Sequence, residues 1–183
     1  IVDGFVAGAS HTTPDVIRVS LQCLGVDERF GLASSCFIMV VPDCIYGEGG
    51  TFVFSDCGVI PEPNSRQLAQ IAITASELVS KVLDFKPRIA LLSYSTKGSA
   101  RGKFVDEVRE ALNLVRQMQP DLLIDGELQV DAAIVPEVAE IKYPNSLLKG
   151  RANVLIFPNL EAGNISYKLV QRLARARAIG PLL

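Results

Sequence analysis

Ile89-Ala-Leu-Leu-Ser-Tyr-Ser-Thr-Lys-Gly-Ser-Ala100 is the stretch that decides the fold, together with the segment 104–118 that follows it. A short apolar run, a polar loop containing glycine and an amphipathic segment follow one another, which predicts a strand, a loop and a helix. The loop would bring hydroxyls, one ammonium group and backbone N–H groups to a helix N-terminus, where anions bind. It therefore predicts a phosphate-bearing ligand, although the same composition also suits a loop that only caps a helix.

The same alternation of strands and helices extends in both directions from this unit. Apolar runs bounded by turn residues predict strands at 1–7, 32–41, 51–55, 88–92, 122–124 and 153–157. Apolar residues at helical spacing predict helices at 13–24, 68–82, 104–118, 131–141 and 164–177. This order indicates an α/β fold with a mainly parallel sheet and flanking helices. The strands 32–41 and 51–55, joined by a glycine-rich turn, add an antiparallel element.

Composition excludes several classes of protein. The 183 residues are 49% hydrophobic and 21% charged, with a formal net charge of −2. There is no basic excess for nucleic acid, and no apolar run reaches the roughly 18 to 20 residues that a membrane span needs. The four cysteines form no C-x-x-C pair and the single histidine, His11, is remote, so no zinc site is expected. Reduced thiols suit a cytoplasmic protein.

The loop before the first predicted helix is, on its chemistry, the best phosphate candidate in the chain. Thr13-Pro14-Asp15 has the pattern of a helix start, with Thr13 as the N-cap. Ser10, Thr12 and Thr13 offer hydroxyls there, and Arg18 lies about one turn into the helix, where a guanidinium could hold a phosphate in bidentate fashion. In the alternative interpretation Thr13 only caps the helix and Arg18 pairs with Asp15 at i, i+3. His11 could donate to an anion or make a structural hydrogen bond.

Two other groups could carry chemistry. The run Asp125–Asp131 places three carboxylates within seven residues, which suits acid–base work or a divalent metal. The preferred interpretation is a strand-to-helix turn in which Asp125 caps the helix and Glu127 favours its start. Cys44 would act as a nucleophile only beside a base, and the sequence offers none.

Six motifs, in the same order along the chain, resemble the phosphate acetyltransferase (phosphotransacetylase) family. They are Asp3–Thr13 followed by Arg18, Val41–Cys44, Leu92–Ala100, Asp125–Pro136, Ala152–Pro158 and Gly163–Lys168. Phosphate butyryltransferases share the fold but resemble this pattern less closely.

The resemblance implies an enzyme that interconverts acetyl-CoA plus phosphate with acetyl phosphate plus CoA, by direct attack of the CoA thiolate on the acetyl carbonyl. It implies no metal or cofactor beyond the CoA substrate, and a homodimer. The implied fold has two domains and is similar to the isocitrate/isopropylmalate dehydrogenases, with the active site in the cleft between them. On that pattern, 1–30 and 158–183 are pieces of the first domain and 31–157 is the second.

The resemblance also implies roles for single residues. Arg18 matches a phosphate-binding arginine of the catalytic site. The matching motifs imply substrate-binding roles for a further set of residues: Ser10, His11, Thr12, Thr13, Thr51, Lys97, Asn164 and Tyr167.

The sequence departs from the family pattern at both ends. A Ser-Arg segment and a catalytic aspartate that follow the Gly-Pro motif in family members are not present, and neither is an N-terminal substrate arginine. Since losing a general base costs about 10²–10⁴-fold in rate, we expect a fragment that is inactive by itself. The alternatives are a non-catalytic ligand-sensing or dimerisation module of the same fold, and an unrelated phosphometabolite-binding protein.

Overall fold

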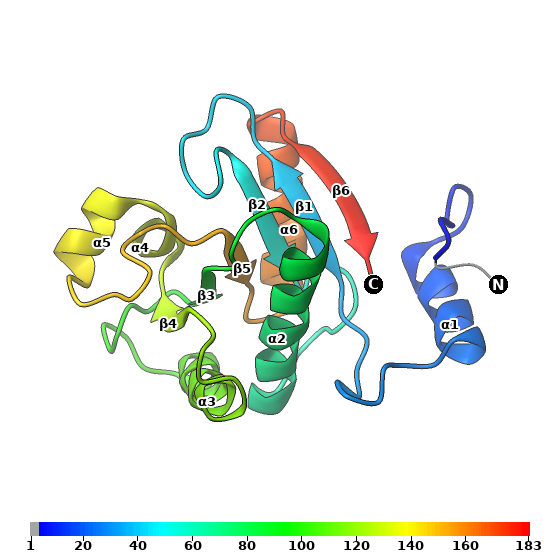
Figure 1. Ribbon diagram of the computed structural model, residues 1–183, viewed down its shortest axis with the longest axis horizontal. Helices are drawn as coiled ribbons and strands as arrows, with labels where there is room; N and C mark the ends of the chain where they lie inside the picture. Colours follow the sequence, from blue (N-terminus) through cyan, green and yellow to red (C-terminus); the bar gives the residue numbers. More distant parts are fainter. Residues whose placement is uncertain (1–3) are drawn as a thin grey trace. The chain divides into compact units, whose positions relative to one another are not determined.

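A sheet of six strands organises residues 34–183 in the computed structural model, which describes residues 4–183 (Figure 1). The strand order is β4-β3-β5-β2-β1-β6, and the parallel pairs are β2 with β5, β5 with β3 and β3 with β4. The antiparallel pairs are β1 with β2 and β1 with β6. The strands are β1 (Cys36–Val40), β2 (Thr51–Ser55), β3 (Ile89–Leu92), β4 (Ile124–Leu128), β5 (Val154–Ile156) and β6 (Arg177–Leu182). The expected α/β fold with an antiparallel element is confirmed.

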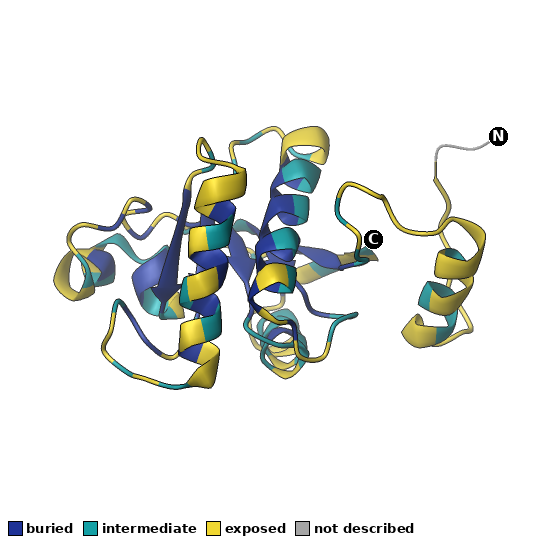
Figure 2. Cartoon of the chain, turned by 90° about the horizontal axis from the view of Figure 1, so that it is seen from below, coloured by how far each residue is buried: buried dark blue, intermediate teal, exposed yellow. Residues whose placement is uncertain are grey.

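Helices cover both faces of this sheet. They are α2 (Ser65–Val82), α3 (Lys103–Met118), α4 (Val130–Ile134), α5 (Pro136–Lys142) and α6 (Leu160–Leu173). Helices α2 and α3 pack on one face and α6 on the other (Figure 1). Each of α2 and α3 has a buried side and an exposed side (Figure 2). Because both faces are covered, the central strands are apolar on both sides.

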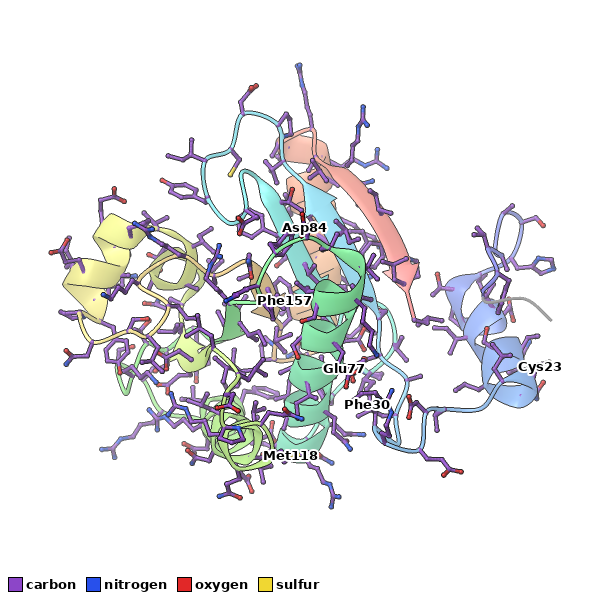
Figure 3. All side chains as sticks on the ribbon, in the orientation of Figure 1. Cys23, Phe30, Glu77, Asp84, Met118 and Phe157 are labelled. Atoms are coloured by element: carbon purple, nitrogen blue, oxygen red, sulfur yellow. The ribbon has the colours of Figure 1, made fainter. Side chains whose placement is uncertain are left out.

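Side chains at alternating strand positions pack into two hydrophobic layers, one on each face of the sheet. Phe37, Phe52, Phe54 and Phe157 belong to the core that Tyr167 of α6 packs against. The ring of Phe157 lies 5.3 Å from that of Phe54, centroid to centroid (its side chain is labelled in Figure 3). The opposite side, toward α2, is lined by aliphatic side chains such as Val53, which is fully buried.

The chain forms two compact units, Ile1–Ala33 and Ser34–Leu183. Of the strand expected at 1–7, residues 1–3 lie outside the described part, and 4–7 have no regular secondary structure, so the expectation is wrong for 4–7. The first unit contains α1 (Thr13–Cys23), no residue of which is buried. The domain limits 1–30 with 158–183, and 31–157, stay a prediction.

Several element limits differ from expectation for physical reasons. The helix expected at 131–141 is two short helices, because Pro136 lacks an N–H and Val135 before it is extended at φ −111°, ψ 113°. The helix expected at 164–177 begins at Leu160 and ends at Leu173. The chain then forms β6, which the sequence did not suggest, because Gly180-Pro181 indicates a turn. Proline is tolerated there because β6 is an edge strand.

Candidate functional site

The N-terminus of α1 holds five of the predicted site residues. Thr12, rather than Thr13, is the N-cap: its hydroxyl accepts from Asp15 N at 3.4 Å and donates to Asp15 Oδ2 at 2.6 Å. Ser10 Oγ lies 3.4 Å from His11 Nδ1. Arg18 Nη2 donates to Asp15 Oδ1 at 2.8 Å.

The pairing of Arg18 with Asp15 is therefore confirmed as a structural contact. Both side chains are exposed, 68% for Arg18 and 42% for Asp15. An exposed pair of this kind is worth under about 1 kcal/mol. Separating the Arg18 guanidinium from Asp15 therefore costs little.

The loop after β3 proves to be a closed hydrogen-bonded structure. Every backbone N–H from 95 to 100 donates within the protein, at 2.8–3.3 Å. The acceptors are Ser93 Oγ, Ser99 Oγ, Glu127 O, Glu127 Oε1, Thr96 O and Ser95 Oγ. Helix α3 begins later, at Lys103 after Gly102, so the loop is not the first turn of the helix. The N–H groups expected for an anion are thus already occupied.

Glu127 of β4 holds this loop from the interior. Its side chain is 2% exposed and accepts from Ser95 Oγ at 2.9 Å and Gly98 N at 2.8 Å. Arg109 of α3 donates through Nε to Oε2 at 2.9 Å and through Nη2 to Oε1 at 3.0 Å. Burial by itself raises the pKa of Glu127, but the hydrogen bonds from Arg109, Gly98 and Ser95 outweigh it and lower the pKa to about 2.

Asp125, two residues earlier, holds the same loop through Lys97. Lys97 Nζ donates to Asp125 Oδ1 at 2.7 Å and to the carbonyl of Gly126, and it lies 5.1 Å from the centre of the Tyr143 ring. Asp125 is 1% exposed and also lies 3.5 Å from Arg116 Nη2. The expectation that Asp125 and Glu127 form a turn and helix start is wrong, because both lie within β4.

The loop after β2 carries a buried carboxylate that the sequence did not suggest. Asp56, 2% exposed, accepts from Ser35 Oγ at 2.5 Å and from the N–H groups of Ser35, Gly58 and Val59 on Oδ1, and from Ile60 N at 2.7 Å on Oδ2. Only the unusual position of an acid directly after an apolar strand could have indicated it.

Helix α6 packs on this loop. A Cβ on Gly163 would lie 2.4 Å from Asp56 O, so only glycine allows the approach. Asn164 Nδ2 donates to Cys57 O at 3.1 Å, and its Oδ1 accepts from Lys168 Nζ at 2.8 Å. Tyr167 stacks on Phe37 with centroids 4.3 Å apart. Burial, followed by the nearby Cys57, raises the pKa of Tyr167.

The structure brings some of the predicted residues together and separates others. Lys97 and Asn164 lie at the carboxyl edge of the parallel strands, where ligands bind in open α/β sheets. Thr51, the first residue of β2, lies at the amino edge. Ser10, His11, Thr12, Thr13 and Arg18 belong to the other unit.

The buried cysteine thiols are not activated as nucleophiles, and the described residues form no cluster of metal ligands. Burial raises the pKa of the Cys57 thiol, and it raises that of Cys36 to about 11, so neither is a ready thiolate. Within residues 4–183, no group of three or more histidine, cysteine or acidic side chains is arranged to hold a metal ion. In the same part of the chain, no helix is long and apolar enough to cross a membrane.

Comparison with known proteins identifies relatives along the whole chain. The family model described as "Phosphate acetyl/butaryl transferase" matches residues 1–183. The phosphate acetyltransferase of Clostridium acetobutylicum is 52% identical over 99% of this chain and 54% of its own length. That of Thermoanaerobacterium thermosaccharolyticum is 53% identical over 98% of this chain and 55% of its own length. A phosphotransacetylase from Streptococcus pyogenes superposes with a TM-score of 0.91 at 44% identity, covering 98% of this chain and 53% of that structure.

The chain thus spans about half the length of the curated relatives it matches. The motifs that carry the resemblance, including the closed loop after β3 and the strand β4 that holds it, lie inside the matched region. The match over residues 1–183 shows that this chain belongs to the phosphate acetyl/butaryl transferase family.

Proposed function

We propose that the native polypeptide containing these 183 residues interconverts acetyl-CoA plus phosphate with acetyl phosphate plus CoA. The match of all 183 residues to the family carries this proposal, supported by relatives named phosphate acetyltransferase at 52% and 53% identity. In this reaction the CoA thiolate attacks the acetyl carbonyl directly, and the phosphate oxygen is the leaving group or, in reverse, the nucleophile. The chemical step uses no metal and no bound cofactor.

Arg18 is the proposed phosphate ligand, with Ser10, His11, Thr12 and Thr13 beside it. The exposed guanidinium, held by Asp15 at 2.8 Å, is oriented at a helix N-terminus where an anion is stabilised. A bidentate contact between arginine and phosphate has the geometry to hold the transferring group. Thr51, Lys97, Asn164 and Tyr167 are further proposed substrate-binding residues. The hydrogen bonds of Lys97 to Asp125 and Gly126 favour a supporting role for it.

We also propose a two-domain architecture, a homodimer and a cytoplasmic location. A mixed sheet with helices on both faces is compatible with a two-domain architecture like that of the isocitrate/isopropylmalate dehydrogenases, with the active site in a cleft. A homodimer is supported by three apolar side chains on α6, Ile165, Leu169 and Leu173, which are 58%, 52% and 81% exposed. Four free cysteines suit a reducing compartment such as the cytoplasm.

The test is phosphate-dependent release of CoA from acetyl-CoA by the native polypeptide and its Arg18→Ala variant. Losing a bidentate charge-assisted contact should raise the KM for phosphate about 10- to 100-fold. Arg29→Ala is the matched control, because Arg29 is an exposed arginine of the same unit paired with Asp27 at 2.6 Å. A larger effect for Lys97→Ala than for Arg18→Ala would move the phosphate site to the loop after β3. CoA binding without any turnover would instead favour the non-catalytic, ligand-sensing module.

A further inference from the structure

Two residues of β4 and the residue Gln129 just after it hold the loop after β3, and the contacts of Glu127 differ from those of the other two. Asp125 contacts the loop through Lys97, and the residue after β4, Gln129, contacts it through Thr96, whose Oγ1 accepts from Gln129 N at 3.0 Å. Glu127 alone contacts two loop positions and is also bound by a helix. It therefore determines how the loop lies relative to α3.

The contacts of Glu127 extend through the loop. Ser95 Oγ donates to Glu127 Oε1 at 2.9 Å and accepts from Ala100 N at 3.1 Å. Gly98, with φ of +92°, donates its N–H to the same carboxylate oxygen at 2.8 Å. Removing the carboxylate charge therefore loosens positions 95, 98 and 100 together.

Arg109 supplies the opposite charge and the fixed geometry. Its two donors are a planar fork, so two parallel hydrogen bonds set both the distance and the angle of the carboxylate. A lysine ammonium carries its three donors on one rotatable nitrogen, so it would not fix the angle of the carboxylate in this way. The side chain comes from the second turn of α3, whose buried residues, including Val105 and Val108, pack it in the core.

We propose that Glu127 and Arg109 are a positioning pair for acyl transfer, which fixes the loop 93–100 at the carboxyl edge of the sheet without touching the reacting atoms. The effect of the pair on acyl transfer rests on the proposed function, whereas its effect on the loop does not. Catalysis is sensitive to such support, since a displacement of about 1 Å at a distance from the chemistry can cost about 10²-fold in rate.

The experiment combines kinetics with amide exchange. In the native polypeptide, Glu127→Gln and Arg109→Gln should each lower kcat about 10- to 100-fold while the KM values for CoA and phosphate change by less than about threefold. Arg109→Lys should be intermediate. The double variant should be no worse than either single variant, because the two side chains act as one unit. In the same variants of the 183-residue chain, exchange at the amides of Gly98 and Ala100 should accelerate at least about tenfold, with Val53 N–H unchanged.

Two further variants separate positioning from stability. Glu110→Gln is the matched control, because the neighbouring carboxylate on α3 accepts from Ser65 Oγ at 2.7 Å, on α2 and not on the loop. It should leave kcat and loop exchange unchanged. Gly98→Ala strains the loop at positive φ while keeping the pair, and it should reproduce the fall in kcat. This variant keeps the test decisive even if Glu127→Gln does not fold.

The outcomes are distinguishable. Normal kcat in folded Glu127→Gln, or accelerated exchange without any kinetic effect, overturns the positioning role while the proposed function stands. A wild-type polypeptide with no acyl transfer from acetyl-CoA to phosphate overturns the proposed function itself. In that case exchange at Gly98 and Ala100 still decides whether the pair controls the loop.

Discussion

Lys97 Nζ lies 2.7 Å from Asp125 Oδ1, and this pair joins the loop after β3 to the buried interior of β4. The lysine is 24% exposed and the aspartate 1%, so the aspartate depends on the lysine for charge compensation. The one ammonium group of the loop that the sequence offered as an anion site is thus paired with an internal carboxylate.

Replacing Lys97 should therefore destabilise the fold. In Lys97→Met, the more distant Arg116 is the one charged partner left to Asp125 among residues 4–183. We expect a loss of about 2 kcal/mol, since a poorly compensated buried charge is costly. Urea denaturation of the chain measures it. Lys103→Met is the control, because Lys103 is 76% exposed and lies 3.8 Å from Glu107. Equal stability of the two variants would contradict a structural role for Lys97.

Lowering the pH should reveal how much the Glu127 carboxylate contributes to the free energy of unfolding. Its pKa is lowered from 4.5 to about 2, so its stabilising contribution is fully present above about pH 4.5 and is lost as the pH falls through about 2. A shift of that size corresponds to roughly 3 kcal/mol. The stability difference between wild type and Glu127→Gln should shrink over this window in thermal unfolding. A difference that stays constant from pH 6 to pH 2 would rule out the charged pair as its source.

Substitution of Asp56 should cause one of the largest losses of folding stability. Asp56→Asn places an NH₂ group against backbone donors that now reach the carboxylate, such as Ile60 N at 2.7 Å. We expect a loss of roughly 2–4 kcal/mol of unfolding free energy, measured by urea titration. The exposed Asp84, at the end of α2 (Figure 3), is the control, and Asp84→Asn should change stability by less than about 0.5 kcal/mol.

Gly163→Ala tests the contact of α6 with the loop after β2. Alanine in a helix interior normally gains about 1 kcal/mol over glycine. Here its Cβ would meet Asp56 O at 2.4 Å and Cys57 Sγ at 3.0 Å, so we expect a loss of about 2 kcal/mol or more. Glu161→Ala, on an exposed position of the same helix, is the control for thermal unfolding. A stabilised Gly163→Ala protein would show that α6 does not approach the loop this closely.

Local patterns in the sequence predicted much of the architecture because they reflect short-range physics. Asn64 and Gln67 lie three residues apart before an apolar helical stripe, which is the sequence pattern of a capping box. The box forms, with hydrogen bonds of 3.0 Å in both directions. The hairpin partner β2 spans Thr51–Ser55, the range that its apolar run predicted. The pairing of Arg18 with Asp15 likewise follows from i, i+3 spacing.

Only the tertiary structure decided where the polar residues of the site go. Asp125 and Glu127 form a polar run that is typical of a turn, yet they lie in a buried strand, because Lys97 and Arg109 from other elements neutralise them there. The strand β6 exists because β1 offers it a partner, despite glycine and proline within it. Charge compensation and strand pairing join residues distant in the chain, so no local pattern of one sequence encodes them.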